Sequence, residues 1–166
     1  MERLWSPWRL EYVTSTADAR GCVFCDALGD ESAGSLVIHR GETCFVILNL
    51  YPYNSGHLMV VPNRHISTLA SALPGERHEM MDLTRVAEQV LTEAYRPQGL
   101  NVGMNLGRSA GAGIVDHIHI HVLPRWHGDT NFMSVVGEVR VLPEDLTQTV
   151  LRLRPVFARI ANEPAR

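Results

Sequence analysis

The chain contains no lysine. All 15 basic residues among its 166 residues are arginine. A P-loop holds phosphate with a lysine, and Schiff-base catalysis needs a lysine amine, so both kinds of site are excluded. Any bound phosphate group must therefore be held by arginine, histidine, asparagine or backbone N–H groups.

Long apolar runs and an excess of positive charge are also absent. No apolar run approaches the ~18 residues that span a membrane. The first residues include Glu2, Arg3, Arg9 and Glu11 where a signal peptide would be apolar. We therefore expect no membrane partner and a cytoplasmic location, in which the three cysteines would be reduced. The net charge of −3 gives no basic footprint, so no nucleic-acid partner is expected.

The length and composition predict one globular domain. The chain has 45% hydrophobic and 20% charged residues, which is ordinary for a folded protein. We expect a single domain over residues 1–166 with its core at about 20–130. Residues 1–19 are expected to pack across a surface, and residues 143–162 are expected to form a C-terminal helix.

Hydrophobic periodicity predicts the main elements. Apolar residues at helical spacing predict one helix over residues 74–95, with Ser71 as its N-cap, and the second over 143–162. Further strands are predicted from apolar runs over residues 43–48 and 57–61 and from alternation over residues 100–106. In the last of these we expect a half-buried strand, with its buried face formed by Leu100, Val102, Met104 and Leu106.

Three histidines alternate with apolar residues near the end of the chain's core. Alternation predicts a strand over residues 117–123, so that His117, His119 and His121 share one face. The opposite face would carry apolar side chains for the core. Imidazole can be a neutral nucleophile or a protonated anion binder near pH 7, and it is a common zinc ligand. The row therefore indicates a functional site.

The segments on both sides of this row carry further candidates. Residues 107–113 contain three glycines, which allow positive φ and leave N–H groups accessible to an anion. A hairpin through this loop would place Asn105 on the histidine face. Trp126, at the far end of the strand, could stack on a base or only pack.

Cys22 and Cys25 form a C-x-x-C pair. Such a pair can be a zinc half-site, a redox pair or a coincidence. A redox pair usually lies in a βαβ unit, and no strand pattern precedes this one. A zinc half-site would need two further ligands elsewhere in the chain.

The histidine row resembles the signature of the histidine triad (HIT) superfamily, in which three histidines alternate with apolar residues. Asn49, His57 with its flanking Gly56 and Leu58, and the stretch 61–65 resemble the family's first two core strands. The resemblance covers about residues 20–130. It implies an α+β fold with a five-stranded antiparallel sheet, two main helices and a homodimer that extends the sheet.

The resemblance also implies nucleotidyl transfer through a covalent histidine intermediate. His119 would attack the α-phosphorus of a nucleotide, and His121 would contact the phosphate and the leaving group. The other implied substrate-side residues are Asn49 at the ribose, Asn105 with the N–H groups near Gly111 and Gly113 at the phosphate, Trp126, and His57 as a group supporting the triad.

The C-x-x-C pair is similar to that of the family's zinc-bearing branch. The resemblance implies that zinc binds Cys22, Cys25, His65 and His117. A closed set of two cysteines and two histidines suits a structural ion. The alternative is a pair of bare thiols, with His65 capping the segment that follows it.

The leading prediction is a dinucleoside polyphosphate hydrolase or phosphorylase, with diadenosine tetraphosphate as substrate. The stretch from Pro124 to Phe132 resembles bacterial diadenosine tetraphosphate phosphorylases, although Ile120 stands where those carry glutamine. Ala112 and Gly113 replace the Gln-Ser or Gln-Thr of many family hydrolases. The alternatives are a nucleoside phosphoramidase, a non-catalytic nucleotide- or zinc-binding module, and a metal enzyme with its ion on the three triad histidines.

Overall fold

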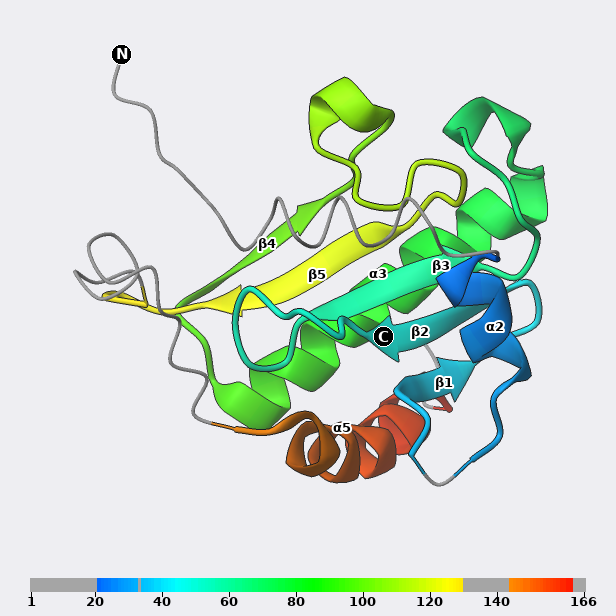
Figure 1. The fold of residues 1–166 in the computed structure, drawn as a ribbon. Coiled ribbons are helices and arrows are strands. Elements are labelled where there is room, and N and C mark those ends of the chain that lie inside the picture. Colours follow the sequence, from blue (N-terminus) through cyan, green and yellow to red (C-terminus); the bar gives the residue numbers. More distant parts are fainter. Residues whose placement is uncertain (1–20, 33, 130–143, 163–166) are drawn as a thin grey trace, which may run out of the picture.

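The computed structural model describes residues 21–32, 34–129 and 144–162 (Figure 1). Within them, a five-stranded antiparallel sheet has the order β1-β2-β3-β5-β4. The strands are β1 (Val37–Arg40), β2 (Cys44–Leu48), β3 (Leu58–Pro62), β4 (Gly99–Gly103) and β5 (Ile120–Arg125). The helices are α2 (Val23–Gly29), α3 (Pro74–Tyr95) and α5 (Leu146–Ala161), with short 3-10 turns η2 (Leu69–Ser71) and η3 (Arg108–Ala110). The predicted α+β fold with two main helices is confirmed.

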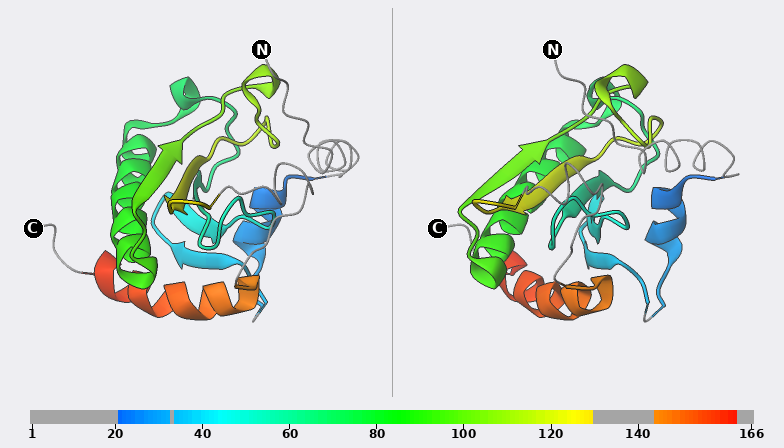
Figure 2. Two further views of the ribbon diagram at one scale, coloured as in Figure 1. Left: turned by 90° about the vertical axis from the view of Figure 1, so that its left-hand side faces the viewer. Right: turned by 60° about the vertical axis from the view of Figure 1, so that its left-hand side comes forward.

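Helices cover both faces of the sheet. Figure 2 shows α3 and α5 on one side and the short α2 on the other. The larger core lies between the sheet and α3 and α5, and includes Val60, Val122 and Phe157. A smaller core lies under α2 and includes Phe24 and Met59. Every residue of β2 and β3 is buried, which is why both strands read as continuous apolar runs.

Helix α3 has the predicted bounds of 74–95, but the predicted N-cap is wrong. The N-cap is Leu73, whose N–H donates to the carboxylate of Glu76 at 2.7 Å. Ser71 belongs to the preceding turn η2. The helix ends at Tyr95, and its C-cap residue Arg96 adopts a left-handed conformation with φ of 47° before Pro97.

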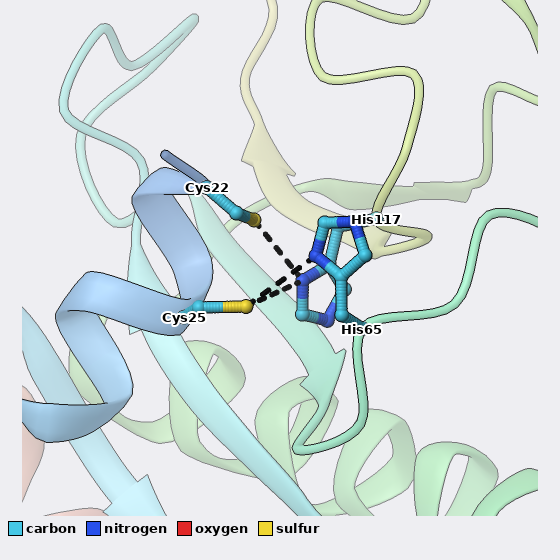
Figure 3. Close-up of side chains that lie close together, drawn as sticks. All are labelled: Cys22, Cys25, His65 and His117. Atoms are coloured by element: carbon cyan, nitrogen blue, oxygen red, sulfur yellow. Dashed lines mark hydrogen bonds between the residues drawn. The ribbon is translucent and has the colours of Figure 1, made fainter. Parts of the chain in front are cut away.

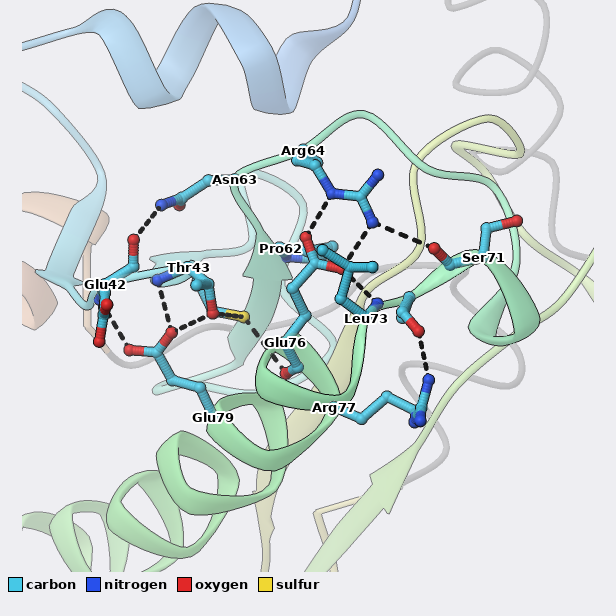
Figure 4. Close-up of polar contacts among 12 residues, drawn as sticks. Glu42, Thr43, Pro62, Asn63, Arg64, Ser71, Leu73, Glu76, Arg77 and Glu79 are labelled. Carbon is cyan, nitrogen blue, oxygen red and sulfur yellow. Dashed lines mark hydrogen bonds and ion pairs between the residues drawn. The ribbon is translucent and has the colours of Figure 1, made fainter.

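Two glutamates fasten the start of α3 to the sheet (Figure 4). Glu79 accepts hydrogen bonds from the N–H groups of Glu42 and Thr43 at 2.7 and 2.6 Å. The buried Glu76 pairs with Arg64 through two contacts of 2.6 and 2.8 Å. The helix is thereby bound to the loop before β2 and to the segment after β3.

Strand β4 differs from the predicted half-buried strand. It ends at Gly103 rather than 106, and Val102 and Leu106 are 52% and 48% exposed. Leu100 and Met104 pack against the helix-side core. The expectation fails because β4 lies at the edge of the sheet, where a strand is covered less completely.

Strand β5 begins three residues later than the predicted 117–123 and runs through Arg125. Before the ladder starts, the N–H of Ile118 donates to the carbonyl of Ile66 at 2.8 Å. The segment holding the first two triad histidines is therefore tied to the loop after β3 rather than to a neighbouring strand.

Helix α5 begins at Leu146, with Asp145 as its N-cap, rather than at 143. The carboxylate of Asp145 accepts from the N–H of Gln148 at 2.9 Å. The predicted packing segment 1–19 lies outside the described residues. None of the described helices is both long and apolar enough to cross a membrane.

Candidate active site and metal-binding site

The three triad histidines lie on the sheet face that α2 covers. The ring of Phe24 in α2 is 5.4 Å from the ring of His117 and 4.9 Å from that of His119. His121 pairs in register with Met59, a member of the α2-side core. The rings of His119 and His121 are 4.7 Å apart and nearly perpendicular. The predicted sharing of one face is confirmed, although the strand begins later.

Hydrogen bonding fixes which nitrogen of His119 carries a proton. Its Nδ1 lies 2.9 Å from the carbonyl oxygen of His117. A carbonyl only accepts, so Nδ1 holds the proton and Nε2 keeps its lone pair. Burial lowers the pKa of His119, and the bond to the carbonyl offsets this only in part. His119 is therefore a neutral imidazole near pH 7, with an unprotonated nitrogen available for attack.

A second chain of hydrogen bonds fixes His121. The N–H of Tyr53 donates to Nδ1 of His57 at 3.2 Å, so His57 carries its proton on Nε2. That nitrogen lies 3.0 Å from Nδ1 of His121, which accepts, and His121 must then carry its own proton on Nε2. Burial and the nearby His119 lower the pKa of His121 to about 4. His121 is thus a neutral hydrogen-bond donor.

His57 itself is fully buried. It lies behind His121, as expected of a group that supports the triad. Asn49 lies beside it, with its Nδ2 3.4 Å from Nδ1 of His57. The Oδ1 of Asn49 accepts from the N–H of Tyr51 at 2.9 Å, which shapes the loop after β2. Asn49 is thus half-buried next to the triad.

The glycine-rich loop is organised by its own hydrogen bonds. Gly111 adopts a left-handed conformation with φ of 90°, and its N–H donates to the carbonyl of Arg108 at 2.9 Å. This N–H, predicted to face a phosphate, is therefore engaged within the turn. The side chain of Asn105 donates to the carbonyl of Gly111 at 3.4 Å and braces the loop. Gly113 follows, half-buried, on the segment that leads to the triad.

Trp126 packs against the end of α3. Its ring is 6.3 Å from the ring of Tyr95, nearly perpendicular to it, and Tyr95 packs against the helix-side core. The tryptophan therefore sits with the elements on the face opposite the histidines. This is the packing alternative, and contact with a nucleotide base stays a prediction.

Two cysteines and two histidines converge at the start of α2 (Figure 3). Sγ of Cys22 lies 3.2 Å from Nδ1 of His117, and Sγ of Cys25 lies 3.4 Å from Nδ1 of His65. One ligand atom from each residue falls within 4.8 Å of the other three. Ligand atoms around a tetrahedral zinc ion are separated by about 3.5 Å, so this spacing suits one ion.

The chemistry of these four residues also fits a metal ion. The Nε2–H of His117 donates to the carbonyl of Pro62 at 2.8 Å, which leaves Nδ1 as the metal-facing nitrogen. Burial lowers the pKa of His117, so it stays in the neutral form that binds metals. Partial desolvation and the adjacent Cys22 raise the pKa of the Cys25 thiol. A bound cation would offset this effect, because its positive charge favours the negatively charged thiolate form of a cysteine.

The same geometry disfavours an ion held by all three triad histidines. His117 turns its Nδ1 to the cysteines, and His119 turns its Nδ1 to a backbone carbonyl. His121 turns its Nδ1 to His57. The Nδ1 atoms of the three imidazoles therefore face three different partners rather than one common ion.

Sequence reasoning missed two residues of this site. Phe24, which lies between the two cysteines in sequence, packs on two triad rings. Its place between the two cysteines was the available signal. The ring of Tyr53, in the loop between β2 and β3, lies 4.7 Å from that of His57 and 6.1 Å from that of His121. No local pattern indicated that contact.

The HIT domain family model matches residues 31–128. The chain belongs to the HIT domain family. The match includes the triad and the glycine-rich loop, while the two cysteines lie before it.

Relatives and solved structures agree with this assignment. The chain is 41% identical over 169 residues to a Mycobacterium tuberculosis protein named AP-4-A phosphorylase, covering 96% of this chain and 86% of that protein. It is 31% identical over 96 residues to the asymmetrical bis(5'-nucleosyl)-tetraphosphatase of Schizosaccharomyces pombe, covering 58% and 52%. A zinc-bound histidine triad family protein from Mycobacterium smegmatis superimposes with a TM-score of 0.68 at 29% identity, covering 85% of this chain and 96% of that one.

Proposed function

We propose that this chain cleaves phosphoanhydride bonds of dinucleoside polyphosphates, with diadenosine tetraphosphate as the leading substrate, through a nucleotidyl intermediate on His119. The observation that carries the proposal is the bond from Nδ1 of His119 to the carbonyl of His117, which leaves Nε2 unprotonated. The names of the two relatives, a phosphorylase and a tetraphosphatase, support this substrate class.

The reaction follows from the two fixed tautomers. The lone pair on Nε2 of His119 forms a bond to the α-phosphorus, while the bonding pair of the P–O bond leaves with the departing phosphate oxygen. The Nε2–H of His121 donates a hydrogen bond to that oxygen as its negative charge develops. Water or inorganic phosphate then attacks the same phosphorus and releases His119. Covalent catalysis thereby divides one displacement into two easier ones.

Other residues would hold the substrate. We assign Asn49, which lies beside His57 directly after β2, to the ribose, as the resemblance to the family implies. Asn105 and the backbone near Gly111 and Gly113 are assigned to phosphate oxygens. Because the N–H of Gly111 already donates to Arg108, either this hydrogen bond breaks when the phosphate binds, or N–H groups of neighbouring residues bind the phosphate instead. For Trp126, contact with the nucleotide base remains a prediction.

Zinc would be held by Cys22, Cys25, His65 and His117 as a structural ion. When bound, it would lock the start of α2 to the loop after β3 and to the first triad histidine. Free thiols are needed for this site, so we assign the protein to the reducing cytoplasm.

A homodimer would form at the exposed edge strand β4. This strand carries the 52% exposed Val102 at the sheet's edge, and pairing with a second copy would cover it. The pairing would continue the sheet across two chains.

Product analysis tests the proposal. Purified protein is incubated with diadenosine tetraphosphate, with and without inorganic phosphate, and the products are separated. Formation of ADP and ATP only with phosphate means phosphorolysis. AMP with ATP without phosphate means hydrolysis at the α-phosphorus. ADP alone without phosphate means hydrolysis of the central anhydride, which would contradict attack at the α-phosphorus. Cleavage of adenosine phosphoramidate but not of diadenosine tetraphosphate would overturn the proposal in favour of a phosphoramidase.

A further inference from the structure

The histidine on the leaving-group side depends on a residue in the loop between β2 and β3. Tyr53 makes contacts with two imidazoles at once. Its N–H donates to Nδ1 of His57 at 3.2 Å, and its ring lies 4.7 Å from the ring of His57 and 6.1 Å from that of His121. The backbone of Tyr53 is therefore connected to His121 through His57, and its side chain packs near His121 directly.

We propose that Tyr53 is a positioning residue that makes His121 a fixed hydrogen-bond donor toward the departing group. The inference rests on the proposed function, because it takes His121 to face the departing oxygen. It assigns Tyr53 a role in leaving-group departure rather than in nucleophilic attack.

The backbone of Tyr53 sets the direction of the hydrogen-bond chain. An amide N–H can only donate, so His57 must accept at Nδ1 and donate from Nε2. If His57 reversed its tautomer, its Nδ1–H would face the N–H of Tyr53. His121 would then lose the donor at its Nδ1, and its own proton would move away from the substrate side.

The ring of Tyr53 sets the orientation of the same imidazoles. His57 is fully buried, whereas Tyr53, whose ring packs 4.7 Å from that of His57, is 41% exposed. The ring of His121 lies 6.1 Å from that of Tyr53 and 4.7 Å from that of His119. Removing the tyrosine ring leaves the backbone donor in place but admits water and frees His121 to turn.

Leaving groups of different basicity separate this role from a structural one. In the first step the P–O bonding pair moves onto the departing oxygen, and the Nε2–H of His121 stabilises it. A strongly basic oxygen needs that donor, whereas an activated, weakly basic oxygen leaves without it. A positioning defect at His121 therefore slows poor leaving groups selectively, and a general loss of structure slows all of them alike.

The test compares the phenyl and p-nitrophenyl esters of AMP, which share the attacked phosphorus and differ in the departing oxygen. For Tyr53→Ala we expect the single-turnover rate to fall about tenfold or more with the phenyl ester and less than about threefold with the p-nitrophenyl ester. Tyr53→Phe keeps the ring and should match the wild type on both. Tyr51→Ala removes another exposed tyrosine of the same loop and should show no such selectivity.

Equal losses on the two esters, or no loss with the phenyl ester, would overturn the inference. Tyr53→Leu, which keeps apolar bulk without a flat ring, repeats the measurement if the alanine variant does not fold. Thermal unfolding confirms that each variant is native. A wild-type protein inactive on both esters and on diadenosine tetraphosphate would instead refute the proposed function.

Discussion

The proton on Nδ1 of His119 is the residue-scale feature on which the proposed chemistry depends. Nδ1 donates this proton to the carbonyl oxygen of His117, which lies 2.9 Å from Nδ1, and no other protonation leaves a nucleophile at Nε2. Replacing His119 with glycine should abolish turnover, by about a thousandfold or more, because no intermediate can form. Steady-state rates with diadenosine tetraphosphate measure the loss, and circular dichroism checks the fold. Substantial residual activity in a folded variant would remove His119 from the nucleophile role.

Gly56 shows a second residue-scale constraint, directly before His57. Its φ is +80°, and an added Cβ would lie 2.7 Å from the ring of Tyr95 and 3.1 Å from Leu91. Gly56→Ala should lower the free energy of unfolding by about 1–3 kcal/mol through strain and crowding. Urea denaturation measures it. The control Gly75→Ala, in the first turn of α3 with open space around its Cβ, should be neutral or stabilising.

At the scale of elements, β1 and α5 meet where the titratable ring of His39 packs on Phe157. The half-buried ring of His39 stacks on Phe157 at 5.0 Å, and burial lowers the pKa of His39, although nearby Glu79 opposes this. Since the pKa is lower in the folded state, protonation favours unfolding. The contribution of neutral His39 is present above the unfolded pKa of about 6.5 and falls as the pH drops below it.

His39→Phe should therefore lose less stability than the wild type between pH 7 and pH 5. Denaturant unfolding at the two pH values measures the difference. His78→Gln is the control, because His78 is 83% exposed and pairs only on the surface with Asp82. An unchanged pH dependence in His39→Phe would show that this contact does not link α5 to acid sensitivity.

Elements with long, regular patterns could be predicted from the sequence, and short ones could not. Helix α3 was predicted with its observed bounds because 22 residues repeat the same apolar face. Strand β1, with only four residues and a bulge against β2, was not recognised. The start of β5 was misplaced because Ile118 keeps the alternation while its N–H bonds to Ile66 outside the ladder. Side-chain periodicity does not report backbone partners.

The site was predictable where chemistry is concentrated in a motif. The four metal-binding candidates were named from their residue types and a family resemblance, and the structure brings them together. The hydrogen-bond engagement of Gly111 was not predictable, because a glycine's freedom leaves its turn partner open. Tyr53 meets His121 only through tertiary folding, across 68 residues of sequence.

At the scale of the whole molecule, the cysteine–histidine cluster joins α2, the loop after β3 and the triad segment. We expect one zinc ion per chain, and chelation or Cys25→Ser should lower the melting temperature, because metal binding contributes to folding. Elemental analysis measures the zinc content, and thermal unfolding measures the melting temperature. Cys44→Ala is the control for zinc content and should keep one zinc ion, since Cys44 is buried outside the cluster and burial raises its pKa to about 11. Zinc retained in full by Cys25→Ser would contradict the ligand assignment.

The edge strand β4 gives the second prediction at this scale. Val102→Glu would place like charges against each other if two β4 strands pair about a two-fold axis. The variant should elute as a monomer under conditions where the wild type is a dimer, as measured by light scattering. Leu151→Glu, at a 62% exposed position on α5, is the matched control and should leave the mass unchanged. A Val102→Glu variant of unchanged mass would exclude this edge.

Strand β5 carries His121 on one side and, through Val122, the main hydrophobic core on the other, and it follows directly after His119, the proposed nucleophile. Repacking beneath this strand would therefore displace the nucleophile even when the protein gains stability. Laboratory selection for heat tolerance should accumulate its changes on the outer surface of α5, where Leu151 is already open to solvent. Variants altered under β5 should instead lose activity while remaining folded.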